Sequence, residues 1–271
     1  MLKYRLIFGT LMTLFFVSLM LFDGWLDGSL TASMADKTPQ GSILTLLVAL
    51  LAIPANLEIG RLTAAKSYKL LKPVTIVASM IFATGFYWIQ FFEGINLTFI
   101  TSVLMAFTIC CLFLYQYRRY GLDNVVANCS LSCFTVIYLG ILSSFIPAIR
   151  IKFGLWHLLM VIFVIKCSDI GAYTAGKLFG KHKFSPVISP KKTWEGMGGA
   201  VVAAIIVAVL FAVIFGIMSW LTAIAFGLCF AFIGQLGDLA ESMIKRDMQT
   251  KDSASSVPGF GGILDVIDSP L

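Results

Sequence analysis

Long apolar segments separated by short polar loops are the dominant pattern of this 271-residue chain. A helix of about 20 apolar residues crosses the hydrocarbon core of a bilayer. The alternation of apolar and polar positions that is typical of outer-membrane strands is absent from the sequence. The pattern predicts an all-α protein, a polytopic transmembrane helical bundle. We expect eight spans, at residues 6–22, 42–57, 74–92, 97–115, 125–146, 154–175, 198–217 and 221–244.

The spans form two regions that differ in polar content. Residues 1–150 hold about five spans and carry no polar motif of their own. In residues 151–271, charged side chains interrupt the sixth and eighth spans, and polar loops follow them. We therefore predict an N-terminal transmembrane region and a C-terminal region that contains the functional site.

Composition agrees with a membrane protein, since 59% of the residues are hydrophobic, 13% are charged, and the mean hydropathy is +0.92. The net charge of +6 comes from basic residues scattered over short loops, so we expect no nucleic-acid partner. The six cysteines lie inside apolar segments, and Cys129 and Cys133, one helical turn apart, are predicted to be small packing residues.

Basic residues also predict the orientation of the bundle. With the N-terminus inside, 16 of the 20 Lys and Arg residues fall on the inner side. Only Lys37, Arg150 and Lys152 fall outside, and Lys166 lies within a span. Cytoplasmic loops are enriched in Lys and Arg, so the N-terminus and the polar motifs are expected to be cytoplasmic.

A polar cluster stands at the end of the eighth span. Asp238, Glu241, Ser242 and Lys245 follow helical spacing and share one face. Charge within hydrocarbon costs about 2.5–3.5 kcal/mol per residue, so the cluster needs a metal, a partner or a charged substrate. Carboxylates beside cations suit a magnesium–phosphate site. The alternative is a cluster that extends its charges to the membrane surface.

A second polar group begins in the sixth span. Lys166 and Asp169 share a helical face with Tyr173 and Lys177, and either bind a ligand or neutralise each other. Two more lysines, Lys191 and Lys192, follow in a proline-containing loop. They suit phosphate binding, but equally suit a role in topology or contact with anionic lipids.

Both groups resemble signature sequences of the phosphatidate cytidylyltransferases, also called CDP-diacylglycerol synthases. The first signature matches Asp169-x-x-Ala-Tyr-x-x-Gly and, further on, Ser-Pro-Lys-Lys-Thr-Trp-Glu-Gly at residues 189–196. The second matches Ser242, Lys245, Arg246, Lys251 and Asp252, then Pro258, Gly259, Gly261 and Gly262, then Asp265 and Asp268. Phe260 stands where the family usually has His, and Val266 where it usually has Arg.

The resemblance implies transfer of CMP from CTP to phosphatidic acid, with CDP-diacylglycerol and pyrophosphate as products. It implies Mg²⁺, in a two-metal site whose second metal is unidentified, with Asp238, Asp265 and Asp268 as catalytic residues and metal ligands. Lys245 and Arg246 are the other expected catalytic residues. The expected substrate-binding residues are Lys191, Lys192, Ser242, Lys251, Lys166 and Asp169.

Further expectations about the setting follow from the same resemblance. It implies a homodimer among membrane lipids, in the inner (plasma) membrane of a prokaryote. Family members usually continue into one more apolar span, so a ninth is expected beyond Leu271.

Two other functions stay open at this stage. A secondary transporter would also place Lys and Asp in the membrane, although the predicted outer side is nearly bare of polar residues. A CTP-dependent lipid kinase would use the same substrate chemistry but would transfer the γ-phosphate. A scaffold protein has little use for so many clustered carboxylates.

Overall fold

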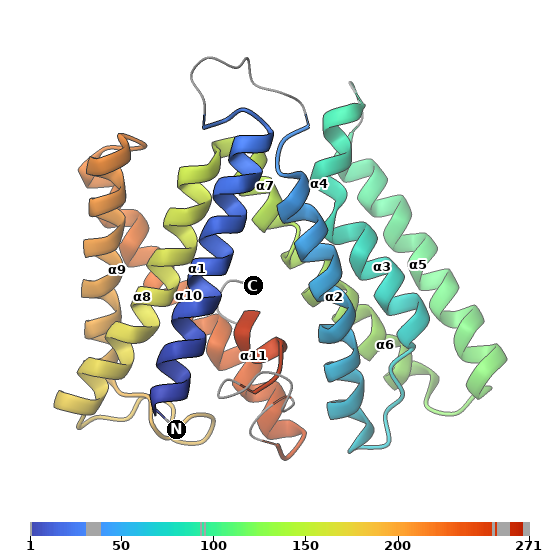
Figure 1. Ribbon diagram of the computed structural model, residues 1–271. Helices are drawn as coiled ribbons and strands as arrows, with labels where there is room; N and C mark the ends of the chain where they lie inside the picture. The colour runs from blue at the N-terminus through green and yellow to red at the C-terminus, as the bar shows by residue number, and fades with distance from the viewer. Residues whose placement is uncertain are drawn as a thin grey trace. The chain divides into compact units, whose positions relative to one another are not determined.

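The computed structural model describes residues 2–30, 39–92, 94, 96–250, 253 and 261–267. They fall into two compact units, one within residues 1–155 and 252–265 and one within residues 156–251 and 266–271. Figure 1 labels the helices. The helices of the first unit are α1 (Leu2–Leu26), α2 (Ser42–Ala64), α3 (Lys72–Ala83), α4 (Gly85–Trp88), α5 (Leu97–Tyr120), α6 (Val125–Val136), α7 (Phe145–Phe153) and the start of α11 (Leu264–Ile267). Those of the second are α8 (Leu155–Phe179), α9 (Trp194–Phe215) and α10 (Trp220–Asp247).

Most of these helices are long and apolar enough to cross a membrane. Among the described residues, seven qualify alone, and an eighth span results if α3 and the helical turns after it count together. That pair is bent by 46° near Thr84. A π-helical stretch, Ile137–Leu142, follows α6 within one long span. The prediction of an all-α transmembrane bundle is confirmed, and the protein is an integral membrane protein.

In the second unit, α9 and α10 pack side by side through small residues (Figure 1). Alanines recur every fourth residue along α9 and are buried, at positions 200, 204, 208 and 212. On α10, a Cβ added to Gly227 would lie 2.7 Å from Ile205 Cα. Because lipid is as apolar as leucine, such helices associate through close packing rather than through the hydrophobic effect.

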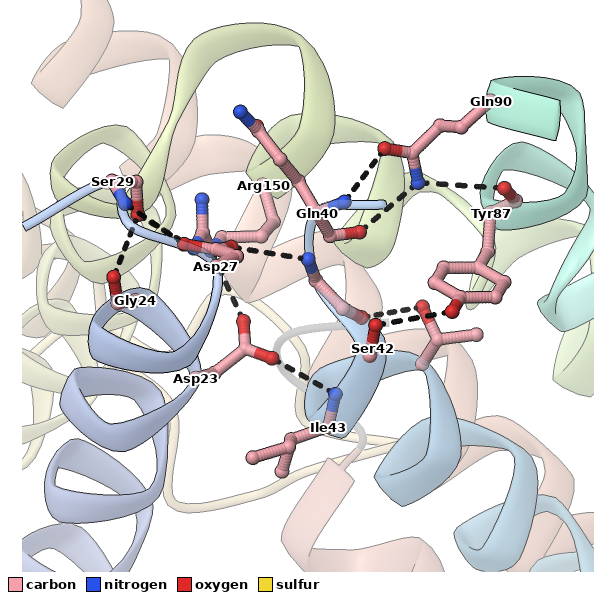
Figure 2. Close-up of polar contacts among 12 residues, drawn as sticks. Asp23, Gly24, Asp27, Ser29, Gln40, Ser42, Ile43, Tyr87, Gln90 and Arg150 are labelled. Atoms are coloured by element: carbon pink, nitrogen blue, oxygen red, sulfur yellow. Dashed lines mark hydrogen bonds and ion pairs between the residues drawn. The ribbon is translucent and has the colours of Figure 1, made fainter. Parts of the chain in front are cut away.

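A buried ion-pair network joins α1, α2 and α7 in the first unit (Figure 2). Arg150 Nε lies 3.3 Å from Asp23 Oδ2, and Arg150 Nη2 lies 2.5 Å from Asp27 Oδ2. Arg150 is fully buried, and Asp23 also accepts a hydrogen bond from the Ile43 backbone N–H at 2.8 Å. The sequence places Arg150 in an outer loop, whereas the structure places it within α7 as the partner of two carboxylates.

Candidate functional site

The loop between α8 and α9 in the second unit is held in a defined shape by its own ends. Lys183 and Thr193 form an antiparallel bridge, and the Trp194 N–H donates to the His182 carbonyl at 2.9 Å. Thr193 caps α9 by accepting a hydrogen bond from the Gly196 N–H at 3.1 Å. The cap explains why the helix begins here. It also fixes Lys191 and Lys192 directly before the helix.

Lys192 connects this loop to α10. Its Nζ lies 2.7 Å from Asp238 Oδ2 and 3.3 Å from the Gln235 carbonyl oxygen. Gln235 Nε2 in turn donates to Asp169 Oδ1 on α8 at 3.2 Å. Three predicted residues are thus brought together. Lys192 contacts Asp238 directly, and Gln235 connects Lys192 to Asp169. A lysine held by one carboxylate and one backbone carbonyl, and open in part to solvent, is suited to recognise phosphate oxygens.

Gln235 is the member of this group that the sequence analysis missed. It precedes Asp238 by three residues, so helical spacing places both on one face of α10. Its side chain is neutral and therefore gives no charge signal within an apolar segment. The structure identifies Gln235 as part of the group, because it is buried and forms hydrogen bonds with Lys192 and Asp169.

The remaining predicted residues of α10 lie further along the same helix. Ser242 Oγ is 3.5 Å from Asp238 Oδ1, which is a long contact for two oxygens. Arg246 Nε donates to the Ile188 carbonyl at 3.2 Å and so ties the lysine-containing loop to the end of α10. Lys245 forms an ion pair with Glu241, a fully buried carboxylate that the sequence analysis left without a role.

Two further predicted lysines lie on the loop and on α8. Lys191 is exposed to solvent beside Lys192, in a position where its charge is accessible. Lys166 lies half-buried on α8, three residues before Asp169, and takes part in interactions of its own.

Asp265 belongs to the first unit, where its Oδ2 organises a tight turn. This oxygen accepts hydrogen bonds from Ser253 Oγ at 2.6 Å, Ser253 N–H at 3.0 Å and Gly262 N–H at 2.6 Å. Glu58 of α2 contacts the same segment and is a second residue that the sequence analysis missed. The predicted second span ends at residue 57, which made Glu58 look like a loop residue.

Lys251 and Asp268, both predicted site residues, lie outside the described part of the chain. Within the described part, no group of three or more His, Cys, Asp or Glu side chains is close enough to hold a metal ion. Asp238 and Asp265 offer carboxylate oxygens, the donor type that Mg²⁺ prefers, so their chemistry fits that ion.

Glycines allow α8 and α9 to approach closely. A Cβ added to Gly171 would lie 2.5 Å from the Gly199 carbonyl oxygen, and one added to Gly199 would lie 2.6 Å from the Gly171 carbonyl oxygen. Neither glycine has room for a methyl group. The spacing between the helix of Asp169 and the helix that follows the lysine loop therefore depends on both.

Gly199→Ala is expected to destabilise the protein by about 1–3 kcal/mol, because the new methyl group must force two helices apart. Gly198→Ala is the matched control, since a Cβ at that position of the same helix meets nothing within 4 Å. Thermal unfolding in detergent should show a lower midpoint for Gly199→Ala alone. Equal midpoints for the two variants would contradict the close packing of α8 and α9.

Comparison with known proteins places the chain in a family. The model of the cytidylyltransferase family matches residues 3–271. The chain belongs to the cytidylyltransferase family. The resemblance drawn from the two signatures is confirmed.

Individual cytidylyltransferases are similar over most of their length. The phosphatidate cytidylyltransferase of Staphylococcus aureus (strain COL) is 34% identical over 224 residues, which cover 82% of each chain. That of Staphylococcus epidermidis (strain ATCC 35984) is 32% identical over 234 residues, covering 84% of this chain and 86% of the relative. The phosphatidate cytidylyltransferase of Mycobacterium bovis is 41% identical over a shorter stretch of 117 residues, 43% of this chain.

Proposed function

We propose that this membrane protein transfers CMP from CTP to phosphatidic acid, giving CDP-diacylglycerol and pyrophosphate. The observation that carries the proposal is the family match along nearly the whole chain. Relatives named phosphatidate cytidylyltransferase share about a third of their residues with it over more than four-fifths of its length. The protein is therefore a nucleotidyltransferase that uses CTP.

The reaction joins two anions, which determines what the protein must supply. A phosphomonoester oxygen of phosphatidic acid attacks the α-phosphorus of CTP, and the bond to the β-phosphate bridging oxygen breaks. The phosphomonoester is already ionised near neutral pH, so the reaction needs no dedicated general base. What remains is to hold the two phosphate groups in line and to offset their repulsion.

Lys192 is the cation best placed for that task. Its ammonium group is fixed by Asp238 and by the Gln235 carbonyl, so it approaches a phosphate without losing further side-chain freedom. Lys191, exposed beside it, adds a second charge for the triphosphate. We assign phosphate contacts also to Arg246, Lys245 and Ser242 on α10, and to Lys251.

Asp169 and Lys166 on α8 are assigned to substrate binding. Asp169 accepts a hydrogen bond from the Gln235 side chain, and the backbone carbonyl of the same residue accepts one from Lys192, so Gln235 brings Asp169 close to the lysine. We assign Mg²⁺ binding to the carboxylates of Asp238, Asp265 and Asp268, with a second, unidentified metal ion. When bound, Mg²⁺ offsets negative charge on the phosphate oxygens.

The proposal also sets the protein in a membrane. We propose the inner membrane of a bacterium, with the N-terminus and the lysine loop in the cytoplasm, because most Lys and Arg residues fall on that side. The lipid then enters the site sideways from the inner leaflet. We also expect a homodimer, which the molar mass of the protein in detergent would test.

The proposal is tested with purified protein in mixed micelles that contain CTP, Mg²⁺ and one of two lipids. Phosphatidic acid should yield a lipid heavier by a CMP group, with an equal amount of pyrophosphate. Diacylglycerol, which lacks the phosphomonoester, should yield neither product. Phosphorylation of diacylglycerol with release of CDP would instead identify a lipid kinase and overturn the proposal.

A further inference from the structure

Glu58 is a buried carboxylate on α2, with an exposed fraction of 2%. An ionised side chain at such a site is stable only if hydrogen bonds replace its lost water. Three hydrogen-bond donors to it, Ser253, Ile263 and Leu264, lie in the segment around α11, about 200 residues further along the chain. The carboxylate therefore joins a membrane-spanning helix to the signature sequence that contains Asp265.

Both oxygens of Glu58 are used. Oε1 accepts a hydrogen bond from the Ile263 N–H at 2.9 Å, and Oε2 accepts one from the Leu264 N–H at 2.9 Å and lies 3.2 Å from Ser253 Oγ. Two backbone donors thus face two different oxygens of one side chain. A carboxylate satisfies this arrangement, because it accepts hydrogen bonds at both oxygens and donates none.

The same segment also forms hydrogen bonds with Asp265. Ser253 Oγ lies within hydrogen-bond distance of both Glu58 and Asp265, and the Gly262 N–H reaches Asp265 directly. Gly262 leaves no room for a side chain, since a Cβ there would collide with Ser253 Oγ and Glu58 Oε2. The carboxylates of Glu58 and Asp265 therefore both contact this short turn, and Ser253 lies between them.

We propose that Glu58 is a positioning residue for the reaction, which fixes the turn of residues 262–264 and through it the carboxylate of Asp265. The inference rests on the proposed function, in which Asp265 binds Mg²⁺. Glu58 itself touches neither substrate nor metal in this account. It acts as the supporting hydrogen-bond acceptor that keeps a reacting group within a narrow range of positions.

Glu58→Gln is the decisive variant, because it keeps the shape of the side chain and replaces one oxygen with an NH₂ group. In either orientation, that NH₂ group faces a backbone N–H, of Ile263 or of Leu264, and one of the two donors loses its acceptor. The kcat of the variant should fall about tenfold or more, as is usual when a supporting contact is lost, while KM for phosphatidic acid stays unchanged. Ser253→Ala, which leaves the Glu58 side chain and its two backbone donors unchanged, should give a smaller loss of the same kind.

Hydrogen exchange supplies a measurement that needs no turnover. In Glu58→Gln, the peptide covering residues 261–267 should exchange its amide hydrogens faster than in the original protein. Thr63→Val is the matched control, because Thr63 is buried on the same helix and its hydroxyl bonds only to the Ile59 carbonyl of that helix. The control should leave both kcat and the exchange of this peptide unchanged.

The outcomes separate the two proposals. Faster exchange with reduced kcat in Glu58→Gln supports the positioning role. Unchanged exchange, or faster exchange with unchanged kcat, overturns it while leaving the proposed function intact. An original protein that makes no CDP-diacylglycerol overturns the proposed function, and the catalytic role of Glu58 with it.

Discussion

Asp238→Asn is expected to lower the kcat of CMP transfer by about a hundredfold or more, because its negative charge serves both the metal ion and a substrate-binding lysine. The carboxylate is a proposed Mg²⁺ ligand, and it holds the Lys192 ammonium group at 2.7 Å. Asparagine keeps the size of the side chain but has one oxygen and no charge. The lysine then loses its counter-ion, and the metal loses an anionic ligand.

Steady-state kinetics with varied CTP, phosphatidic acid and Mg²⁺ would measure this loss. Asp247→Asn is the matched control, the same substitution at an exposed position of the same helix. The thermal midpoint of Asp238→Asn in detergent should stay close to that of the original protein, since Asp238 is about one-third exposed. Undiminished turnover in Asp238→Asn would remove this residue from the metal-binding set.

Arg150→Met is expected to give the largest loss of stability, about 3–5 kcal/mol, because it leaves two buried carboxylates without their cation. Asp23 lies on α1 and Asp27 in the turn directly after it, and Arg150 binds both of them from α7 (Figure 2). Methionine fills much of the same volume without supplying a charge. The thermal midpoint and the yield of monodisperse protein in detergent should both fall.

Lys152→Met controls for the loss of a positive charge from α7, since Lys152 is exposed. It should change the midpoint little. A triple variant that adds Asp23→Asn and Asp27→Asn to Arg150→Met should regain part of the lost stability, because no buried charge remains unpaired. An Arg150→Met protein as stable as the Lys152→Met protein would contradict the account of this network.

The spans were predictable because hydropathy alone reveals them. The grouping of Asp169, Lys192 and Asp238 was predictable only in part. Asp238 stood out as a charge at the end of an apolar segment, and the motif order suggested that the lysine loop serves the same site. Contact between loop and helix depends on the cap at Thr193, whose effect on the path of the loop is a matter of three-dimensional geometry.

The residues that were missed share a different property. Glu58 and Arg150 each find their partners more than a hundred residues away in the chain, and a single sequence contains no record of such pairs. Both stand just beyond the end of a predicted span, where charge is ordinary. In the structure both belong to helices and are buried, and only the folded chain shows what compensates their charge.

One measurement tests the central claim most directly. The protein is incubated with phosphatidic acid, Mg²⁺ and CTP that carries tritium in the cytidine ring and radioactive phosphorus at the γ position. The account predicts that tritium enters the lipid fraction while all the radioactive phosphorus that is released appears as pyrophosphate, in equal amount. Radioactive phosphorus in the lipid without tritium, or no label in the lipid from a folded and monodisperse protein, would contradict it.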